Sequence, residues 1–331
     1  MKYPANTLSL VADIGGTNTR VALADGRTIL QDSIKRYSNA DHPGLETILR
    51  KYIDEECGVD PAATCVAVAG PVRDGRATMT NLDWTIDKNT LLRSTNAERV
   101  AILNDLQAQG HAIGHIASEN LRVVLEGPEA HDHAAKMVIG VGTGFNCAPV
   151  FETEVGRLVP PSESGHGNLP IRTEKELRLC EYVSTAHGFP SVEDVLSGRG
   201  LTHVYAFLGE EENDPRQKSA ADIMAAVADG SDERAVEAVK VFVRMLGTVA
   251  GNLSLIQLPF GGVYLVGGVA RAMAPYLNEY GFGDAFRDKG RFAGFMKNFS
   301  VTVVEDDYAA LTGCAAHLCA SATQPITDKA D

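Results

Sequence analysis

A turn near the start of the chain combines a carboxylate, two glycines and a hydroxyl group. Its residues are Asp13-Ile14-Gly15-Gly16-Thr17, directly after a short apolar run. A glycine pair lets successive backbone N–H groups approach a ligand without interference from Cβ atoms, and such a turn binds anions. Asp13 is placed to hold Mg²⁺, directly or through water, because Mg²⁺ takes few protein carboxylates. The alternative is a tight hairpin with an exposed Asp, but the flanking Asp and Thr favour phosphate binding.

Two further glycine elements follow apolar segments. The Gly-Thr-Gly turn at residues 142–144 comes directly after residues 136–141, and it suits a phosphate contact and an ordinary turn equally well. Residues 261–270 form an apolar segment between two glycine pairs. Gly267 and Gly268 permit either a flat ligand, such as adenine, against the backbone or close packing of a helix on a strand. Both interpretations stay open.

Polar side chains also follow the apolar segment at residues 100–103. These are Asn104 and Asp105, and in α/β domains ligands bind beyond the carboxyl ends of the strands. Phosphorylation of an alcohol needs a carboxylate that takes the hydroxyl proton as the bond to phosphorus forms. Asp105 is therefore the candidate base. Taken alone, an Asp at this position more often caps the following helix.

A loop rich in Pro and Gly carries a second set of polar groups. Glu163 and His166 are three residues apart, so a carboxylate and an imidazole can bracket vicinal hydroxyl groups. Glu193 lies in a segment that we predict to begin a helix with Ser191 as its N-cap. An acid in that first turn also suits the helix dipole. A polyol site uses several such groups together, because each hydroxyl both donates and accepts.

Composition and charge exclude several classes of protein. The 331 residues are 44% hydrophobic and 22% charged, which is typical of globular proteins long enough for two domains. A net charge of -13 argues against a nucleic-acid partner. The six scattered cysteines predict reduced thiols and a cytoplasmic location, and we expect neither a signal peptide nor a membrane span. The sequence has no Walker A motif and no dinucleotide-binding glycine motif.

Short apolar segments that alternate with helical spacing predict an α/β fold. We expect strands at residues 8–11, 20–24, 64–69, 100–103, 136–141, 262–266 and 301–304. We expect helices at residues 106–115, 220–229 and 233–258, and helical spacing from residue 174. The first two strands should form a hairpin around the glycine turn. The predicted domains are a small one, residues 1–115 plus 305–331, and a large one, residues 116–304.

Taken together, these segments resemble bacterial glucokinases of the non-repressor type, from Asp13 to about His317. The matching pieces are, in order, residues 13–20, 69–72, 79–84, 103–105, 142–144, 163–166, 195–198, 261–268 and 286–292. Each piece is weak alone, whereas their joint order and spacing is specific. The related repressor/kinase family carries a zinc-binding cysteine cluster, which this sequence lacks.

The resemblance implies an actin-like (ribonuclease H-like) two-domain α/β fold with an interdomain cleft. It also implies transfer of the γ-phosphoryl group of ATP to the 6-hydroxyl group of glucose by a homodimer. ATP, with Mg²⁺ at Asp13, would contact Ala12, Asp13, Ile14, Gly15, Gly16, Thr17, Gly142, Thr143, Gly144, Gly267 and Gly268. Glucose would contact Asn104, Asp105, Glu163, His166 and Glu193, with Asp105 as the base.

One departure from the family pattern bears on selectivity. The family's loop at residues 163–166 more often reads Glu-Gly-Gly-His, whereas Ser164 replaces the first glycine here. A kinase for mannose, glucosamine or another hexose therefore stays an alternative, as does a non-catalytic sugar sensor. The phosphoryl donor also stays open, since polyphosphate or ADP can replace ATP.

Overall fold

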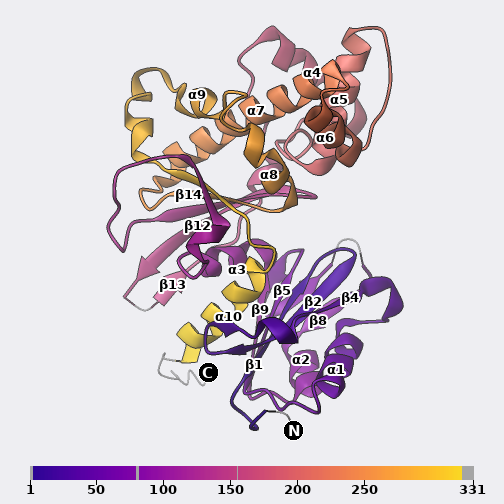
Figure 1. Ribbon diagram of the computed structural model, residues 1–331, viewed down its shortest axis with the longest axis vertical. Helices are drawn as coiled ribbons and strands as arrows, with labels where there is room; N and C mark the ends of the chain where they lie inside the picture. The colour runs from indigo at the N-terminus through magenta and orange to yellow at the C-terminus, as the bar shows by residue number, and fades with distance from the viewer. Residues whose placement is uncertain (1–2, 80–81, 155, 323–331) are drawn as a thin grey trace. The chain divides into compact units, whose positions relative to one another are not determined.

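The computed structural model describes residues 3–79, 82–154 and 156–322. Thr80 and Asn81 of the motif at 79–84, and residues 323–331 of the predicted small domain, lie outside the described residues. The chain divides into two compact units (Figure 1). The first comprises Met1–Ala117, Thr153–Pro161 and Asp306–Asp331, and the second comprises Ser118–Glu152 and Ser162–Glu305. Residues 153–161, which the sequence analysis assigned to the large domain, group with the first unit.

The first unit is built on a mixed sheet with the strand order β3-β2-β1-β5-β9, and β4 pairs with β2. Its strands are β1 (Ser9–Ile14), β2 (Asn18–Asp25), β3 (Thr28–Ile29), β4 (Lys35–Ser38), β5 (Ala63–Val68) and β9 (Arg99–Asn104). The antiparallel hairpin predicted around the glycine turn is confirmed as β1 and β2, while β1, β5 and β9 run parallel. A smaller sheet contains β6 (Val72–Arg73), β7 (Arg76–Thr78) and β8 (Thr85–Asp87), and β13 (Gly156–Leu158) also belongs to this unit.

Helices cover both faces of this sheet. Successive side chains of a strand point to opposite faces, and here the apolar side chains of both faces pack against helices. The helices are α1 (Leu45–Glu55), α2 (Lys88–Thr95), α3 (Asp105–Ala112) and α10 (Ala309–Ala322). Ile14 belongs to the apolar cluster that contains residues of α1 and α2, whereas Val11 belongs to the one that contains residues of α3 and α10. Strand β1 is thus held by a buried core on each side.

The second unit contains a sheet with the strand order β10-β15-β14-β11-β12, in which β11, β14 and β15 run parallel. Its strands are β10 (Leu121–Leu125), β11 (Lys136–Val141), β12 (Phe145–Thr153), β14 (Val263–Val266) and β15 (Val301–Val304). Its helices are α4 (Glu174–His187), α5 (Gly198–Glu211), α6 (Ala220–Asp229), α7 (Glu233–Gln257), α8 (Gly268–Met273) and α9 (Phe282–Arg287). The 3₁₀ helices within the described residues are η1 (Gln31–Ser33), η2 (Asn39–Asp41), η3 (Ser118–Asn120), η4 (Ser164–His166), η5 (Ala274–Tyr276), η6 (Gly290–Phe292) and η7 (Phe295–Asn298).

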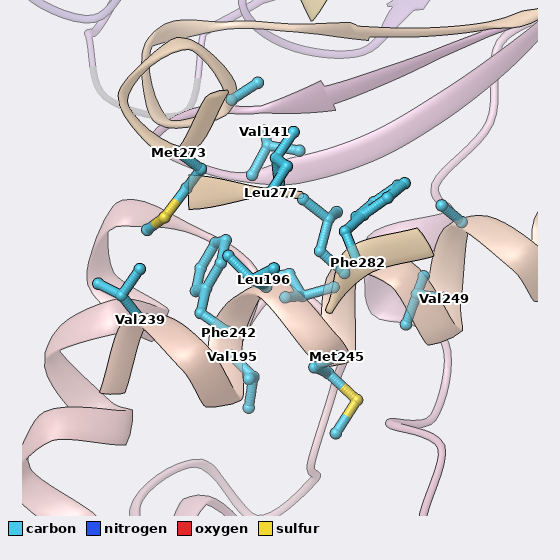
Figure 2. Close-up of a cluster of buried hydrophobic side chains, with 14 of the residues drawn as sticks. Val141, Val195, Leu196, Val239, Phe242, Met245, Val249, Met273, Leu277 and Phe282 are labelled. Carbon is cyan, nitrogen blue, oxygen red and sulfur yellow. The ribbon is translucent and has the colours of Figure 1, made fainter. Parts of the chain in front are cut away.

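A single apolar core fixes the segments that lead into the polar loops of the second unit. Figure 2 shows Val141, the last residue of β11, in one cluster with Val195, Leu196 and Phe242. All four side chains are fully buried. Burial of one such side chain contributes about 1.5–3 kcal/mol. The core therefore holds the strand before the turn at 142–144 beside the segment that follows Glu193.

Helix α7 is long and apolar enough to cross a membrane by length and composition alone, and its most apolar 18-residue window has a mean hydropathy of 1.4. However, 61% of its most apolar window is buried within the protein. Phe242, Leu246 and Ala250, spaced by one helical turn, all belong to the core of the second unit. The apolar character of this helix is therefore explained by its place in the core of the second unit.

Gly313 lets α10 approach α3 closely, since a Cβ atom there would lie 1.7 Å from the carbonyl oxygen of Ala108. We expect Gly313→Ala to force the two helices apart and to lower the free energy of unfolding by about 1–3 kcal/mol, as overpacking does. Urea denaturation followed by circular dichroism measures this loss. Gly294→Ala is the control, because that position is exposed and no atom of the described residues lies within 4 Å of a Cβ built there. Equal stability of the two variants would contradict the close approach.

Candidate active site

The ends of three parallel strands place the candidate residues of the first unit along one edge of its sheet. Ile14 pairs with Val68 of β5, and Val68 pairs with Asn104 of β9. The glycine turn after β1 and the Asn104-Asp105 pair after β9 therefore leave the sheet at the same edge, with β5 between them. Neighbouring strands lie about 4.8 Å apart, so the two groups are separated by about 10 Å. Ligands of α/β sheets bind at such an edge.

The glycine turn is held from outside by Asn39 of η2, a residue that the sequence analysis did not identify. Its Nδ2 donates to the carbonyl oxygen of Gly15 (2.8 Å), and its backbone N–H donates to that of Thr17 (2.9 Å). Its Oδ1 accepts a hydrogen bond from the hydroxyl group of Thr19 (2.8 Å). Asn39 is buried, while Gly16 and Thr17 are exposed at the tip of the turn. The turn is therefore rigid at its base and open where a phosphate would bind.

Asp13 lies just before this turn, with its side chain only 17% exposed. Burial raises the pKa of this carboxyl group, whereas the ion pair with Arg20 opposes that shift. The guanidinium of Arg20 donates to Oδ2 of Asp13 at 3.1 Å. Among the described residues no group of three or more His, Cys, Asp or Glu side chains is arranged so that it could hold a metal ion. One carboxylate nevertheless suits Mg²⁺, because this ion keeps several waters and takes its other ligands from substrate phosphates.

Asp105 is the first residue of α3, and the residue that caps this helix is its neighbour Asn104. Oδ1 of Asn104 accepts the backbone N–H of Gln107 (2.7 Å), and Oε1 of Gln107 accepts the backbone N–H of Asn104 (3.1 Å), which completes a capping box. The alternative in which Asp105 is the N-cap is therefore wrong by one residue. The Asp105 side chain is exposed, and its Oδ1 accepts the backbone N–H of Leu106 (2.8 Å).

The segment at residues 153–161 contacts both ends of α3 and holds them in place. Gln107 at the start of the helix donates from Nε2 to the carbonyl oxygen of Val159 (2.8 Å). At the other end, Nη1 of Arg157 donates to the carbonyl oxygens of Gly110, His111 and Ile113. A cation at a helix C-terminus also suits the helix dipole. These contacts explain why the segment at residues 153–161 groups with the first unit. They also fix the position of α3, the helix that carries Asp105.

In the second unit, the two glycine turns also share one edge of a sheet. Gly140 of β11 pairs with Val266 of β14, so the turn at 142–144 and Gly267 follow directly. Gly267 has φ +101°, and a Cβ atom there would lie 2.6 Å from the carbonyl oxygen of Val141. Close packing thus accounts for Gly267. A Cβ atom on Gly268 would meet none of the described atoms within 4 Å, so space for a ligand lies beside Gly268.

Glu163, His166 and Glu193 belong to one compact arrangement in this unit. Glu163 and His166 are 64% and 65% exposed, with Oε2 and Nε2 3.9 Å apart. Glu193 is linked to their loop through Gly165, since its backbone N–H donates to the Gly165 carbonyl oxygen (2.9 Å). Its carboxylate accepts the backbone N–H of Phe145 (3.0 Å), the residue after Gly144. The structure therefore brings these three predicted sugar-binding residues beside the turn at 142–144.

The predicted helix with Ser191 as N-cap is wrong. Ser191 and Asp194 do form the hydrogen bonds of a helix start, because Oδ2 of Asp194 accepts the backbone N–H of Ser191 (3.2 Å) and the Ser191 hydroxyl oxygen accepts the backbone N–H of Asp194 (3.3 Å). The chain, however, makes only a turn there, and α5 begins later with Ser197 as its N-cap. Gly200 packs so closely on Val195 that a Cβ atom would lie 2.3 Å from its carbonyl carbon. Glu193 therefore lies in a turn.

The fold and these sheet edges define a class of protein. The chain has the actin-like ATPase fold of sugar kinases, which its solved structural neighbours share. It belongs to the glucokinase family, whose model matches residues 10–321. A glucokinase of Rhizobium johnstonii is 31% identical over 310 residues, which cover 93% of this chain and 90% of that protein.

Three solved glucokinases are similar to the chain along nearly its whole length. One from an Antarctic psychrotroph has a TM-score of 0.84 at 30% identity, and the match covers 94% of this chain and 98% of that one. A glucokinase from Balamuthia mandrillaris in complex with glucose has a TM-score of 0.80 at 22% identity, with 95% and 94% covered. A ROK family glucokinase from Streptomyces griseus in complex with glucose and AMPPNP has a TM-score of 0.64 at 20% identity, with 94% and 98% covered. The last two show the fold alone.

Asn104 has two separable roles, as a helix cap and as a predicted sugar ligand. We expect Asn104→Ala to remove the cap and to lower the free energy of unfolding by about 1 kcal/mol. Asn104→Asp retains a cap and should keep most of that stability. Urea denaturation of both variants measures the difference. If the two variants unfold at the same urea concentration, the cap contributes nothing and the assignment fails.

Proposed function

We propose that this chain transfers the γ-phosphoryl group of ATP to the 6-hydroxyl group of D-glucose, with Asp105 as the general base. Membership of the glucokinase family supports the reaction. The observation that carries the base assignment is the position of Asp105, exposed at the start of α3 on the edge that also bears the Asp13 turn. Glucose and AMPPNP are bound in solved glucokinases of the same fold, which supports both substrates.

The first unit supplies the base and one phosphate contact. Asp105 takes the proton of the 6-hydroxyl group as the bond from that oxygen to the γ-phosphorus forms. The bond from the γ-phosphorus to the bridging oxygen breaks, and its electron pair leaves with ADP. Ala12 to Thr17 would contact the phosphates through backbone N–H groups and the Thr17 hydroxyl. When bound at Asp13, Mg²⁺ would neutralise charge on the β- and γ-phosphates.

The second unit supplies the other contacts. The turn formed by Gly142, Thr143 and Gly144 would bind phosphate, and the adenosine would lie near Gly267 and Gly268. Glu163, His166 and Glu193 would bind the hydroxyl groups of the sugar, in addition to Asn104 and Asp105 of the first unit. The exposed carboxylate of Glu163 and imidazole of His166 suit this task, because each sugar hydroxyl both donates and accepts a hydrogen bond.

We also propose that the enzyme works in the cytoplasm as a homodimer. All cysteines in the described residues are free thiols, as expected of a reducing compartment. Phe260 and Phe292 are 42% and 43% exposed, and both contact the ring of Phe295, so they form one apolar surface. Such a surface suits a protein partner. Light scattering of the purified protein tests the dimer, and a monomer mass at micromolar concentration would overturn it.

A coupled assay for ADP tests the reaction itself. We expect turnover with glucose, Mg²⁺ and ATP, and none when any component is left out or when EDTA removes the metal. Mannose and glucosamine in place of glucose, and polyphosphate or ADP in place of ATP, test the alternatives for acceptor and donor. Sugar binding by calorimetry without ADP formation from any hexose would favour a sensor over a kinase.

Asp105→Asn and Asp105→Ala should lower kcat by about 10²–10⁴-fold, which is the usual contribution of a general base. Glucose binding should persist, because the other four sugar contacts remain. The coupled assay measures kcat, and calorimetry measures binding. Asp25→Asn, at an exposed position that ends β2, is the matched control. Near-normal turnover in the Asp105 variants would show that another group takes the proton.

Glu163→Gln should act mainly on sugar affinity. A hydrogen bond to a charged group contributes more than one between neutral groups, so we expect the KM for glucose to rise about tenfold or more. We expect a much smaller change in kcat. Steady-state kinetics with several hexoses separates the two constants, and Glu126→Gln, at an exposed position of the same unit, is the control. An unchanged KM for every hexose would remove Glu163 from the sugar site.

A further inference from the structure

Asn146 ties together two segments that the proposed function uses. It lies on β12, two residues after Gly144, and its side chain reaches the loop of residues 162–167, named here the sugar loop. Its Oδ1 accepts the backbone N–H of Ser164 (3.0 Å) and the hydroxyl group of Ser164 (3.1 Å). Its Nδ2 donates to the carbonyl oxygen of Ser162. One side-chain amide therefore contacts the sugar loop at two residues.

The orientation of this amide is fixed by its neighbours. Oδ1 also accepts the backbone N–H of Cys147 (2.8 Å), so it faces two backbone donors. Reversal of the amide would place its NH₂ group against those donors and its oxygen against the Ser162 carbonyl oxygen. That arrangement would break every one of these hydrogen bonds. The Ser162 hydroxyl adds a further link, since it donates to the carbonyl oxygen of Cys147 (2.7 Å).

Phe145, the residue before Asn146, makes a parallel set of contacts. Its backbone N–H donates to Glu193, and a Cβ atom on Gly165 would lie 1.9 Å from its carbonyl oxygen. The sugar loop thus rests on two consecutive residues of β12. Glu163 and His166 flank the anchored pair Ser164-Gly165, so the backbone of that pair sets the position of both exposed side chains.

Ser164 replaces a glycine that is more frequent in related loops, and the structure gives its hydroxyl a use. That hydroxyl lies within hydrogen-bonding distance of Oδ1 of Asn146. A serine directed at the sugar would change which hexose binds. A serine that acts through Asn146 changes instead how firmly the loop is held. The first possibility predicts a change in the ratio of affinities for different hexoses, whereas the second predicts the same loss of affinity for every hexose.

We propose that Asn146 and Ser164 form a positioning pair, which holds the sugar loop on the strand that leaves the turn at 142–144 and so sets hexose affinity. This inference rests on the proposed function. Neither residue is proposed to touch the reacting atoms. A loop that is already ordered loses less freedom when a ligand binds, so loss of the pair weakens binding of every hexose by the same factor.

The test measures glucose binding by calorimetry and turnover by the coupled assay. Removal of one hydrogen bond should weaken binding about two- to tenfold, so we expect that rise in Kd and KM for Ser164→Ala and for Ser164→Gly. Asn146→Ala removes several bonds and should raise both constants about 10- to 100-fold, while kcat changes much less. The double variant Asn146→Ala with Ser164→Ala should bind no more weakly than Asn146→Ala alone. Asn298→Ala, which loses a single bond to Phe295, is the control and should bind normally.

Hydrogen exchange of the sugar-free protein gives a readout that does not depend on the reaction. The backbone N–H at position 164 should exchange fastest in Asn146→Ala, which removes its acceptor, and somewhat faster than wild type in Ser164→Ala, which loosens the loop. Asn298→Ala should leave its exchange rate unchanged. If Asn146→Ala fails to fold, Ser164→Ala still decides the question through its affinity for sugar.

Several outcomes would overturn the positioning pair. Unchanged affinity in Ser164→Ala would do so, as would additive effects in the double variant or different factors for mannose and glucose. If the wild-type protein phosphorylates glucose and the variants match it, this inference alone fails. If the wild-type protein neither binds nor phosphorylates any hexose, the proposed function fails and the inference fails with it.

Discussion

The register of hydrogen-bonded parallel strands is the constraint on which the rest of the structure depends. In the first unit it aligns Ile14, Val68 and Asn104, and in the second it aligns Gly140 with Val266. A shift of one residue would turn Ile14 out of its apolar cluster, so the core enforces the register. The polar residues are therefore placed by buried neighbours that take no part in chemistry. This explains how exposed groups keep fixed positions at the edge of each sheet.

Glycines serve two different purposes in the loops that follow these strands. In the turn at 142–144, a Cβ atom on Gly144 would lie 2.5 Å from the carboxylate of Glu193, whereas one on Gly142 would meet none of the described atoms within 4 Å. Gly267 and Gly268 differ in the same way. In each pair one glycine permits contact between protein segments, and its partner leaves space beside the backbone. A glycine motif in a sequence therefore combines packing and ligand requirements that only the structure separates.

Much of the fold could be predicted because its strands are short apolar runs that are followed by Gly or a polar residue. Residues 136–141 and 301–304 are such strands, and 220–229 shows the spacing of a helix with Gly230 after it; all three predictions agree with the structure to the residue. The prediction of a helix that begins at Ser191 was wrong for a local reason. A Ser followed three residues later by Asp makes the same hydrogen bonds whether the turn continues as a helix or stops. The turn instead leads into a close approach of Gly200 to Val195, a contact that the helical pattern does not contain.

The residues that hold the candidate site were harder to find than those within it. Asn39 acts on a turn 24 positions away, Arg157 on a helix end 46 positions away, and Asn146 on a loop 18 positions away. Each is an ordinary polar residue whose role depends on a partner that is distant in sequence, so no local pattern marks it.

Glu163 and His166, by contrast, stand out in the sequence but stabilise each other little, because an exposed pair 3.9 Å apart contributes at most about 1 kcal/mol. Their positions must come from the backbone between them. That backbone is fixed where Ser164 bonds to Asn146 and where Gly165 packs on Phe145. The groups that make the site recognisable and the groups that give it a shape are therefore different residues.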